Sequence, residues 1–218
     1  PMTDNTDEQA LRAELAEQYR QLSGAGLNEL SSGNVSIRID DDMLISPSGA
    51  TAKNIGPEVV VRMSLDGEWQ GERKPSSEWR MHAAIYKNTK ASAVIHTHSD
   101  YCVALSCQGQ DLPGFHYLVG TFGGSDVPCT TYKTFGSEEL AESAAQALQK
   151  RTACLLGSHG MICRGRNLEQ AVMLAHRLEI MCRQYVLSRQ LGEPYLLTDA
   201  EWDDFFDRAK KISYGKFI

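Results

Sequence analysis

Two short apolar segments joined by an acidic turn constrain the fold of this chain more than any other feature. Val35, Ile37 and Ile39 alternate with polar residues, and the apolar pattern resumes over 43–45 after the acidic residues 40–42. A period of two places one face of each segment in a core, and the acidic turn reverses the chain between them. The pattern therefore predicts a β-hairpin and, with it, an antiparallel sheet.

Other segments predict helices and further strands. Apolar residues that recur every three or four positions are typical of helices. The predicted helices cover 11–22, 76–87, 100–107, 137–150, 167–190 and 198–211. The further predicted strands cover 59–63, 93–95, 153–156 and 161–163. Strands mixed with helices, several of them linked as hairpins, predict an α/β fold in which a central, largely antiparallel sheet is layered between helices.

Length and charge limit the class of protein. We expect the 218 residues to form a single domain, 1–218, because this length can bury one sizeable core. No apolar run is long enough to span a bilayer, so no membrane partner is expected. The formal charge of −6, without a basic stripe, argues against a nucleic-acid partner. An anionic small substrate would need a local positive site.

Compartment and redox state follow from the first residues and the cysteines. Residues 1–8 are polar and acidic and do not resemble a secretory signal, so we expect a cytoplasmic protein. The six cysteines are scattered without Cys-x-x-Cys spacing. They are therefore predicted to be reduced thiols within the core rather than a disulfide framework or a thiolate metal site.

Three histidines form the sharpest chemical signal. His96 and His98 follow a predicted strand two residues apart, and at this spacing both rings point to one face and can bind one ion. His159 lies within 157–160, at a glycine-rich corner where the backbone can approach closely. Three imidazoles that leave a coordination position open are typical of a catalytic zinc site. Taken singly, each histidine is also compatible with a structural role.

The segment 75–78 predicts a site for an anion. It precedes a predicted helix, so its hydroxyls and free N–H groups converge at the positive end of the helix dipole. An ordinary helix N-cap would have the same residues, and this segment alone does not separate the two interpretations. Glycine-containing turns at 32–34 and 48–49 offer more N–H donors. His82, four residues after Glu78, shares a helical face with that carboxylate or packs in the core.

These motifs in this order carry a resemblance that runs from about Leu11 to the C-terminal residues. They are Gly26-Leu27-Asn28, Gly33-Asn34-Val35-Ser36, the segment 75–80, His96-x-His98, the segment 114–117, Thr134-Phe135-Gly136 and His159-Gly160. The chain resembles the class II aldolase and adducin-head family, and within it the bacterial L-fuculose-phosphate aldolases. No single motif is specific, but their combination is.

The resemblance implies a metal site and a phosphate site. His96, His98 and His159 match the family's zinc ligands. Glu78 matches an acidic residue that ligates the resting ion and then transfers a proton. The positions that match the family's phosphate cradle are Gly33, Asn34, Ser48, Gly49, Ser76 and Ser77.

The resemblance also implies how the subunits and the aldehyde are arranged. Tyr117 matches a tyrosine that reaches into a neighbouring subunit's site as the proton donor. Phe135 and Tyr214 match residues at the aldehyde end of the pocket. The implied fold is a three-layer αβα arrangement, and the implied assembly is a homotetramer with inter-subunit active sites.

The implied activity is that of a zinc-dependent sugar-phosphate aldolase, a carbon–carbon lyase. Such an enzyme makes or breaks a phosphorylated ketose from dihydroxyacetone phosphate and a short aldehyde such as lactaldehyde. The bound cation stabilises the enediolate, and no lysine stands out as a Schiff-base nucleophile. Cobalt or manganese would also fit such ligands.

Other activities on the same fold remain open at the level of sequence. They are a methylthioribulose-phosphate dehydratase, a decarboxylase of a phosphorylated 3-oxo acid and a sugar-phosphate 4-epimerase. Similar epimerases carry aspartate at the position of Glu78, which disfavours that alternative. A non-enzymatic, adducin-like module is disfavoured because it lacks the metal ligands that this chain has.

Overall fold

A mixed sheet of seven strands, in the order β3-β2-β1-β4-β7-β6-β5, organises the chain in the computed structural model, which describes residues 5–212. The strands are β1 (Asn34–Ile39), β2 (Asp42–Ile45), β3 (Val61–Ser64), β4 (Ala93–Thr97), β5 (Cys129–Thr130), β6 (Ala153–Leu156) and β7 (Gly160–Gly165). Neighbouring strands are antiparallel except for β5 and β6, which are parallel. The predicted hairpin is the β1–β2 pair, and the prediction of a central, largely antiparallel sheet is confirmed.

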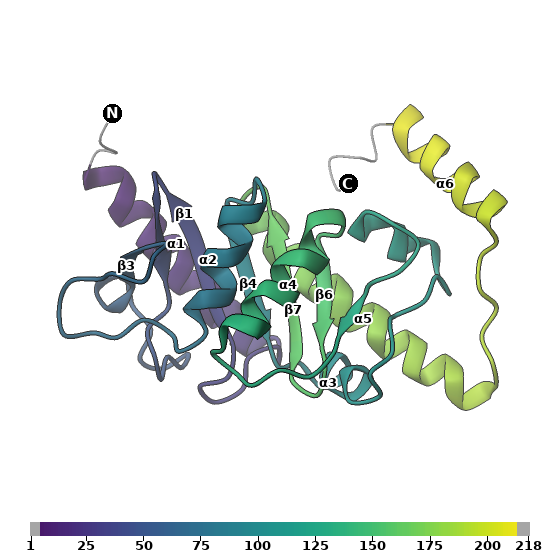
Figure 1. Ribbon diagram of the computed structural model, residues 1–218, viewed down its shortest axis with the longest axis horizontal. Helices are drawn as coiled ribbons and strands as arrows, with labels where there is room; N and C mark the ends of the chain where they lie inside the picture. Colours follow the sequence, from purple (N-terminus) through teal and green to yellow (C-terminus); the bar gives the residue numbers. More distant parts are fainter. Residues whose placement is uncertain (1–4, 213–218) are drawn as a thin grey trace.

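Helices cover both faces of this sheet (Figure 1). They are α1 (Asn5–Gly24), α2 (Trp79–Asn88), α3 (Asp100–Ser106), α4 (Glu138–Lys150), α5 (Leu168–Leu191) and α6 (Asp199–Lys211), with short 3₁₀ turns η1 (Pro57–Val59) and η2 (Tyr117–Phe122). One apolar core joins α1, α3 and α5 to one face, and a second joins α2 and α4 to the other. The fold is therefore the three-layer α/β arrangement that was predicted.

The alternation within β1 decides which side chains face which layer. Val35 and Ile37 point into the core shared with α1 and α5, where each side chain contributes roughly 1.5–3 kcal/mol by burial. Asn34 and Ser36 occupy the alternate positions and bond to side chains of α2. They are fully buried polar residues, so they need hydrogen-bond partners there. This polar stripe lies behind the site described below.

The structure corrects several predicted boundaries. The strand predicted at 59–63 begins at Val61 rather than at Val59, because Val59 belongs to the turn η1, where Pro57 has a φ that suits a helical turn. Helix α2 begins at Trp79 rather than at Ser76. The two-residue strand β5 and the turn η2 were not predicted, because neither is long enough to show a periodic pattern.

The thiols and the hydropathy of the helices bear on two further expectations. All six cysteines are free, as predicted. Four are buried, whereas Cys129 is half-buried and Cys107 is exposed, so the prediction of core positions is wrong for Cys107. None of the helices in the described part of the chain combines the length and apolar character that crossing a membrane requires.

Candidate active site

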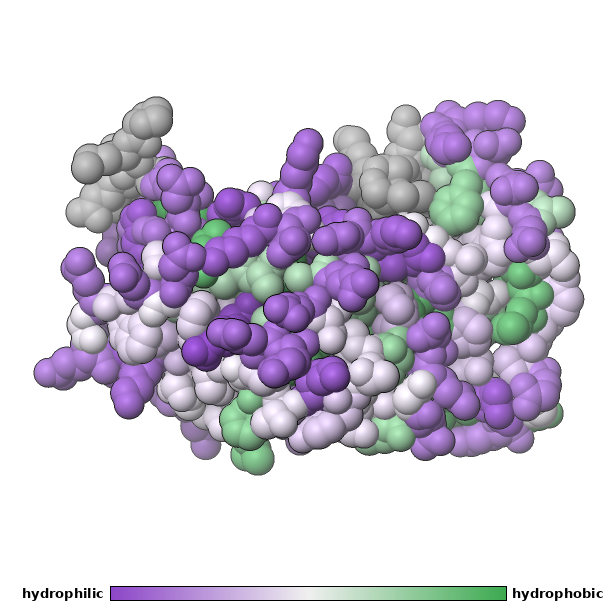
Figure 2. Space-filling view, in the orientation of Figure 1, coloured by the Kyte–Doolittle hydropathy of each residue, from purple (hydrophilic) through white to green (hydrophobic). Residues whose placement is uncertain are grey.

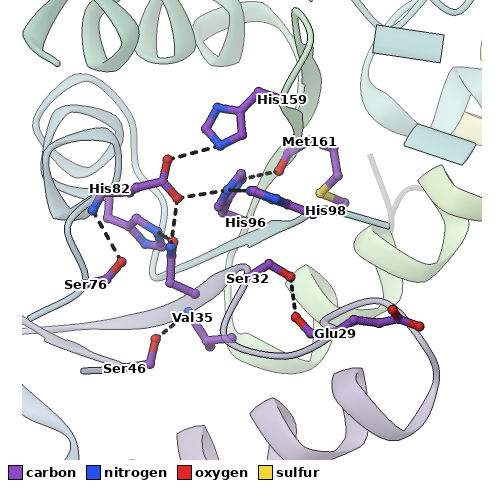
Figure 3. A network of polar contacts seen from close by, with 12 residues as sticks. Glu29, Ser32, Val35, Ser46, Ser76, His82, His96, His98, His159 and Met161 are labelled. Carbon is purple, nitrogen blue, oxygen red and sulfur yellow. Dashed lines mark hydrogen bonds and ion pairs between the residues drawn. The ribbon is translucent and has the colours of Figure 1, made fainter. Parts of the chain in front are cut away.

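Three histidines and one glutamate converge at the end of the sheet where β4 ends and β7 begins. One potential ligand atom from each of Glu78, His96, His98 and His159 lies within 4.8 Å of all the others. The three imidazole ring centres are 4.8 Å apart in each pair. Figure 3 shows the three rings turned toward one point, with dashed lines marking the ion pairs to a carboxylate. The histidines that the sequence singled out are therefore brought together.

The hydrogen bond of His96 shows that this cluster suits a cation. Its Nδ1 donates to the carbonyl of Met161 at 2.7 Å, so a neutral His96 carries its lone pair on Nε2. That Nε2 lies 3.0 Å from Glu78 Oε2 and 2.9 Å from His98 Nε2. Lone pairs this close to each other and to a carboxylate require a positive charge between them, which a proton or a metal ion can supply.

The charge states agree with a set of metal ligands. Burial, followed by the proximity of His96 and His159, lowers the pKa of His98 to about 4, so its ring is neutral near pH 7. Burial alone would raise the pKa of Glu78, but His96 and His159 hold it well below its usual range. Glu78 is thus an ionised carboxylate. Its Oε1 is buried 3.1 Å from His159 Nε2, without a hydrogen-bond donor aligned on it.

This donor set fits a divalent metal ion. Three imidazole nitrogens and a carboxylate oxygen are the ligands that zinc and similar transition metals take in proteins. His96 and Glu78 are buried, whereas His98 and His159 are half-buried and face an open cavity. A bound ion would therefore be held from one side and would be reachable by a small molecule from the other.

Backbone geometry brings the turn that carries His159 close to β4. His159 sits in the turn between β6 and β7, next to Ser158, whose φ of 51° is in the left-handed region. A Cβ atom on Gly160 would lie 2.4 Å from the carbonyl oxygen of Thr97, so only glycine lets this turn approach β4 so closely. His96 is the residue of β4 that pairs with Asn34 of β1. The close approach of these backbones brings His159 next to His96 and His98.

A cavity of about 370 Å³ opens over the cluster. Its walls include Glu78, His98 and His159 together with Phe135. Three turns complete the wall with the residues Ser31, Ser32, Gly33, Asn34, Pro47, Ser48, Gly49, Ser76 and Ser77. All six positions that the resemblance implied for phosphate therefore lie around one cavity, next to three of the four possible metal ligands.

Backbone hydrogen bonds hold the turns of this cavity together. Ser76 N–H donates to the carbonyl of Ser46 at 3.1 Å, and Ser48 N–H donates to Lys74 at 2.9 Å. The hydroxyl of Ser46 accepts from Val35 N–H at 3.1 Å, which ties the same turn to β1. The three turns therefore form one connected unit, although they are far apart in the sequence.

Positive charge at this cavity does not come from basic side chains. No lysine or arginine is among the lining residues within the described part of the chain. Helix α2 begins at the cavity wall, and its N-cap Glu78 makes no side-chain capping hydrogen bond. An anion there would rely on backbone N–H groups, serine hydroxyls, the dipole of α2 and a bound cation.

A chain of buried side chains lies behind Glu78. Asn34 Nδ2–H donates to Glu78 Oε2 at 3.2 Å, and Asn34 Oδ1 bonds to His82 Nε2. The other ring nitrogen of His82 bonds to the hydroxyl of Ser36 at 2.7 Å, which in turn bonds to the hydroxyl of Tyr86 at 2.7 Å. Asn34 was predicted to bind phosphate, and no separate role was predicted for Ser36 or Tyr86. The spacing of four residues between Glu78, His82 and Tyr86 is a signal that could have found Tyr86, and the spacing of two between Asn34 and Ser36 could have found Ser36.

Other predicted residues lie elsewhere. Tyr117 is half exposed at the start of η2, stacks on His116 at 4.8 Å and contacts Phe205 of α6. It is not among the residues that line the cavity of its own chain. Phe135 is at the cavity and is 67% exposed. Tyr214 lies outside the described residues.

The chain is similar to known proteins over most of its length. Residues 13–186 match the family model described as class II aldolase and adducin N-terminal domain. The 5-methylthioribulose-1-phosphate/5-deoxyribulose-1-phosphate aldolase of Rhodospirillum rubrum is 42% identical, over 94% of this chain and 93% of that protein. The L-fuculose phosphate aldolase of Escherichia coli K12 is 37% identical, over 89% of this chain and 91% of that protein.

Solved structures give the same result. An L-fuculose 1-phosphate aldolase superposes with a TM-score of 0.88 and 33% identity, covering 96% of this chain and 98% of the other. The sheet, its helical layers and the order of its elements are therefore shared with class II aldolases.

Proposed function

The chain belongs to the class II aldolase and adducin N-terminal domain family, and on that premise we propose that it is a metal-dependent aldolase acting on ketose 1-phosphates. It breaks or forms the bond between carbons 3 and 4, with dihydroxyacetone phosphate and a short aldehyde as the two parts. The observation that carries the proposal is the cavity over the cluster of three imidazoles and a carboxylate, whose wall is completed by three turns rich in serine and glycine. One end suits a cation and the other suits a phosphate.

The cation is proposed to be zinc, held by His96, His98, His159 and Glu78, with cobalt and manganese as functional substitutes. When bound, it supplies Lewis-acid stabilisation of the negative charge that develops on the ketose oxygens as the bond breaks. Support comes from the convergence of the four ligand atoms and from the lone-pair arrangement around His96.

The protein's own residues are proposed to hold the substrate and move two protons. In the condensation direction, the Glu78 carboxylate removes a proton from carbon 3 of dihydroxyacetone phosphate. That carbon then bonds to the aldehyde carbon, and Tyr117 gives a proton to the aldehyde oxygen. Cleavage runs the same transfers in reverse. Glu78 is ionised at neutral pH, because His96 and His159 hold its pKa below its usual range, so the carboxylate is free to accept a proton.

The phosphate is proposed to bind at the six positions around the three turns. Ser76 and Ser77 lie just before α2, where the helix dipole favours an anion. Gly33 and Gly49 both have positive φ, which lets their turns present N–H groups inward. The side chain of Asn34 is already bonded to Glu78 and His82, so its role at this end rests on its backbone.

We propose that the protein forms a homotetramer in which Tyr117 of one subunit acts at the active site of a second subunit. Its hydroxyl-bearing ring is 48% exposed and does not line the cavity of its own chain, which supports action on a second subunit's site. Figure 2 shows hydrophobic surface at its right edge, along the segment that joins α5 to α6. Leu187 and Leu191 at the end of α5 are 46% and 93% exposed, and Leu196 in the joining segment is 48% exposed. Sedimentation of a monomer at assay concentration would remove this part of the proposal.

The aldehyde is the part of the substrate on which the similar proteins differ. By the names of the Rhodospirillum rubrum protein and of the solved L-fuculose 1-phosphate aldolase, their sugars share the phosphate on carbon 1 but differ beyond carbon 4. Cleavage of 5-deoxyribulose 1-phosphate gives acetaldehyde, the methylthio sugar gives methylthioacetaldehyde, and fuculose 1-phosphate gives lactaldehyde. We propose that dihydroxyacetone phosphate is common to all three and that the exposed ring of Phe135 contacts the aldehyde.

The test is a condensation assay with metal-loaded and chelator-treated protein. Dihydroxyacetone phosphate is offered with acetaldehyde, methylthioacetaldehyde or lactaldehyde, and consumption of the phosphate compound is followed. Metal-dependent condensation is expected, and the ratio of kcat/KM among the aldehydes identifies the preferred sugar. Absence of condensation by protein with stoichiometric metal would exclude the aldolase proposal and favour loss of water or carbon dioxide from a related sugar phosphate.

A further inference from the structure

The buried chain behind Glu78 is assembled from two regular spacings. Glu78, His82 and Tyr86 are four residues apart at the start of and along α2, so they share one face of the helix over roughly 6 Å per step. Asn34 and Ser36 are two residues apart on β1 and share one face of the strand at a step of roughly 6.6 Å. Because the steps nearly match, the two rows interdigitate in the order Tyr86, Ser36, His82, Asn34, Glu78.

Every hydrogen bond in this buried row of side chains has a defined donor and a defined acceptor. The Glu78 carboxylate only accepts, so the amide group of Asn34 faces it and the carbonyl of Asn34 faces His82. His82 must therefore carry its proton on Nε2 and accept on Nδ1. The hydroxyl of Ser36 then donates to that Nδ1 and accepts from the hydroxyl of Tyr86. Turning any one group around would place two acceptors against each other.

The five side chains that form this row of hydrogen bonds are also shielded from water. Ser36 and His82 are fully buried, and Tyr86, Asn34 and Glu78 are exposed by 1%, 3% and 7%. Burial is the main cause that lowers the pKa of His82 to about 3, so its ring stays neutral and keeps this tautomer at neutral pH. In a site closed to water, each bond of such a chain fixes the orientation of the next group.

We propose that His82 is a positioning residue that orients the Glu78 carboxylate through Asn34. The inference rests on the proposed function, because it concerns the residue that would move the proton. His82 does not touch the cavity; it holds Asn34 so that its amide restrains Oε2 while Oε1 stays free beside His159. Without it, Asn34 can rotate and the carboxylate loses one fixed direction.

Two amide side chains of different length at position 82 separate positioning from packing. His82→Gln places an amide N–H near the former Nε2, within reach of Asn34, whereas His82→Asn is too short to reach it. Both remove the ring, and asparagine leaves the larger space by one methylene, so the Tm of each variant is measured as well. We expect His82→Asn to lower kcat about 10- to 100-fold with KM within about threefold of the wild type, as for other partners of metal ligands. His82→Gln should retain kcat within about threefold.

A second readout does not depend on turnover. Cobalt(II) replaces the native metal, and its visible absorption reports the geometry of the ligands. The spectrum of His82→Asn should shift because the carboxylate turns, and that of His82→Gln should match the wild type. Ser36→Ala removes one hydroxyl only and should give a smaller shift in the same direction. It also keeps the test available if both changes at position 82 prevent folding.

The outcomes are distinct. A wild-type kcat and a wild-type cobalt spectrum in His82→Asn, or in Ser36→Ala where position 82 cannot be changed, overturn the proposal. So do equal losses in the asparagine and glutamine variants that follow a shared drop in Tm, because these indicate packing alone. If the wild type fails to cleave any ketose 1-phosphate, the proposed function fails, and the cobalt spectra still decide whether His82 orients Glu78.

Discussion

The candidate metal-ligand cluster and the aromatic residues proposed to act on the aldehyde are held in opposite ways. His96 is fully buried, and its two ring nitrogens contact Met161, Glu78 and His98 at 2.7–3.0 Å. Tyr117 and Phe135 are 48% and 67% exposed. The ring of Tyr117 contacts the rings of His116 and Phe205 at the surface.

The difference separates chemistry that needs fixed geometry from recognition that can vary. A proton transfer beside a cation requires side chains held within a fraction of an ångström, which buried and fully bonded groups provide. An exposed aromatic ring can accept aldehydes of different length, because apolar contacts discriminate only modestly. Changes in the cluster should therefore remove catalysis, whereas loss of the Phe135 ring should change which aldehyde is preferred.

The largest effect is expected from Glu78→Gln. The change removes the proposed base but keeps three imidazoles, so kcat should fall about 10²- to 10⁴-fold while metal remains bound. Rate assays and metal analysis of the same sample measure both. Glu72→Gln, an exposed carboxylate outside the cluster, is the matched control and should keep full rate. Full activity in Glu78→Gln would end its assignment as the base.

A smaller effect is expected from Tyr117→Phe. The ring contacts with His116 and Phe205 remain, and only the hydroxyl that would protonate the aldehyde oxygen is lost. We expect kcat to fall about 10- to 100-fold, at the low end of general-acid effects, with unchanged metal content. Tyr132→Phe, at another exposed tyrosine, is the control. Equal rates in the two variants would show that the hydroxyl of Tyr117 takes no part.

The pH dependence of the free energy of unfolding tests whether the buried row of hydrogen-bonded side chains behind Glu78 excludes water. His82 is neutral in the folded metal-free protein, where its pKa is about 3, but titrates near 6.5 when unfolded. The unfolded state thus binds one more proton between these values, and stability is lost as pH falls from 6.5 toward 3. His82 therefore changes the equilibrium constant between the folded and unfolded states by up to about tenfold per pH unit. Urea unfolding at pH 7 and pH 5 should show a smaller drop for His82→Gln than for the wild type; equal drops would mean that water reaches this ring.

The smallest effect is expected from Phe135→Ala. The ring lines the cavity but is mostly exposed, so its loss should change the ratio of kcat/KM between methylthioacetaldehyde and acetaldehyde by about threefold to tenfold. The KM for dihydroxyacetone phosphate should stay constant, since its proposed site is formed by the three turns. A change in that KM without a change in aldehyde preference would reverse the assignment of the two ends.

Sequence patterns predicted the parts of the fold that have a strong period. The alternation over 35–39 and the helical spacing of the longer helices lie where predicted, because burial selects one face of each element. The elements whose bounds or existence were not predicted are short or are preceded by a proline. The strand predicted at 59–63 begins later because of Pro57, and β5 contains only two residues. The roles of the ligand residues, by contrast, came from spacing together with resemblance.

By itself, the sequence determined the ingredients of this protein: a hairpin-rich sheet, a His-x-His pair after a buried strand, a histidine at a glycine corner and an acidic residue before a helix. These are local properties, because period, turn chemistry and spacing act over a few residues. Only the tertiary structure decided that Asn34 faces Glu78 and that His82 lies behind it. It also decided that the three turns surround one cavity and that Tyr117 lies outside that cavity. Such contacts join residues more than 40 positions apart, and no local pattern encodes which of them meet.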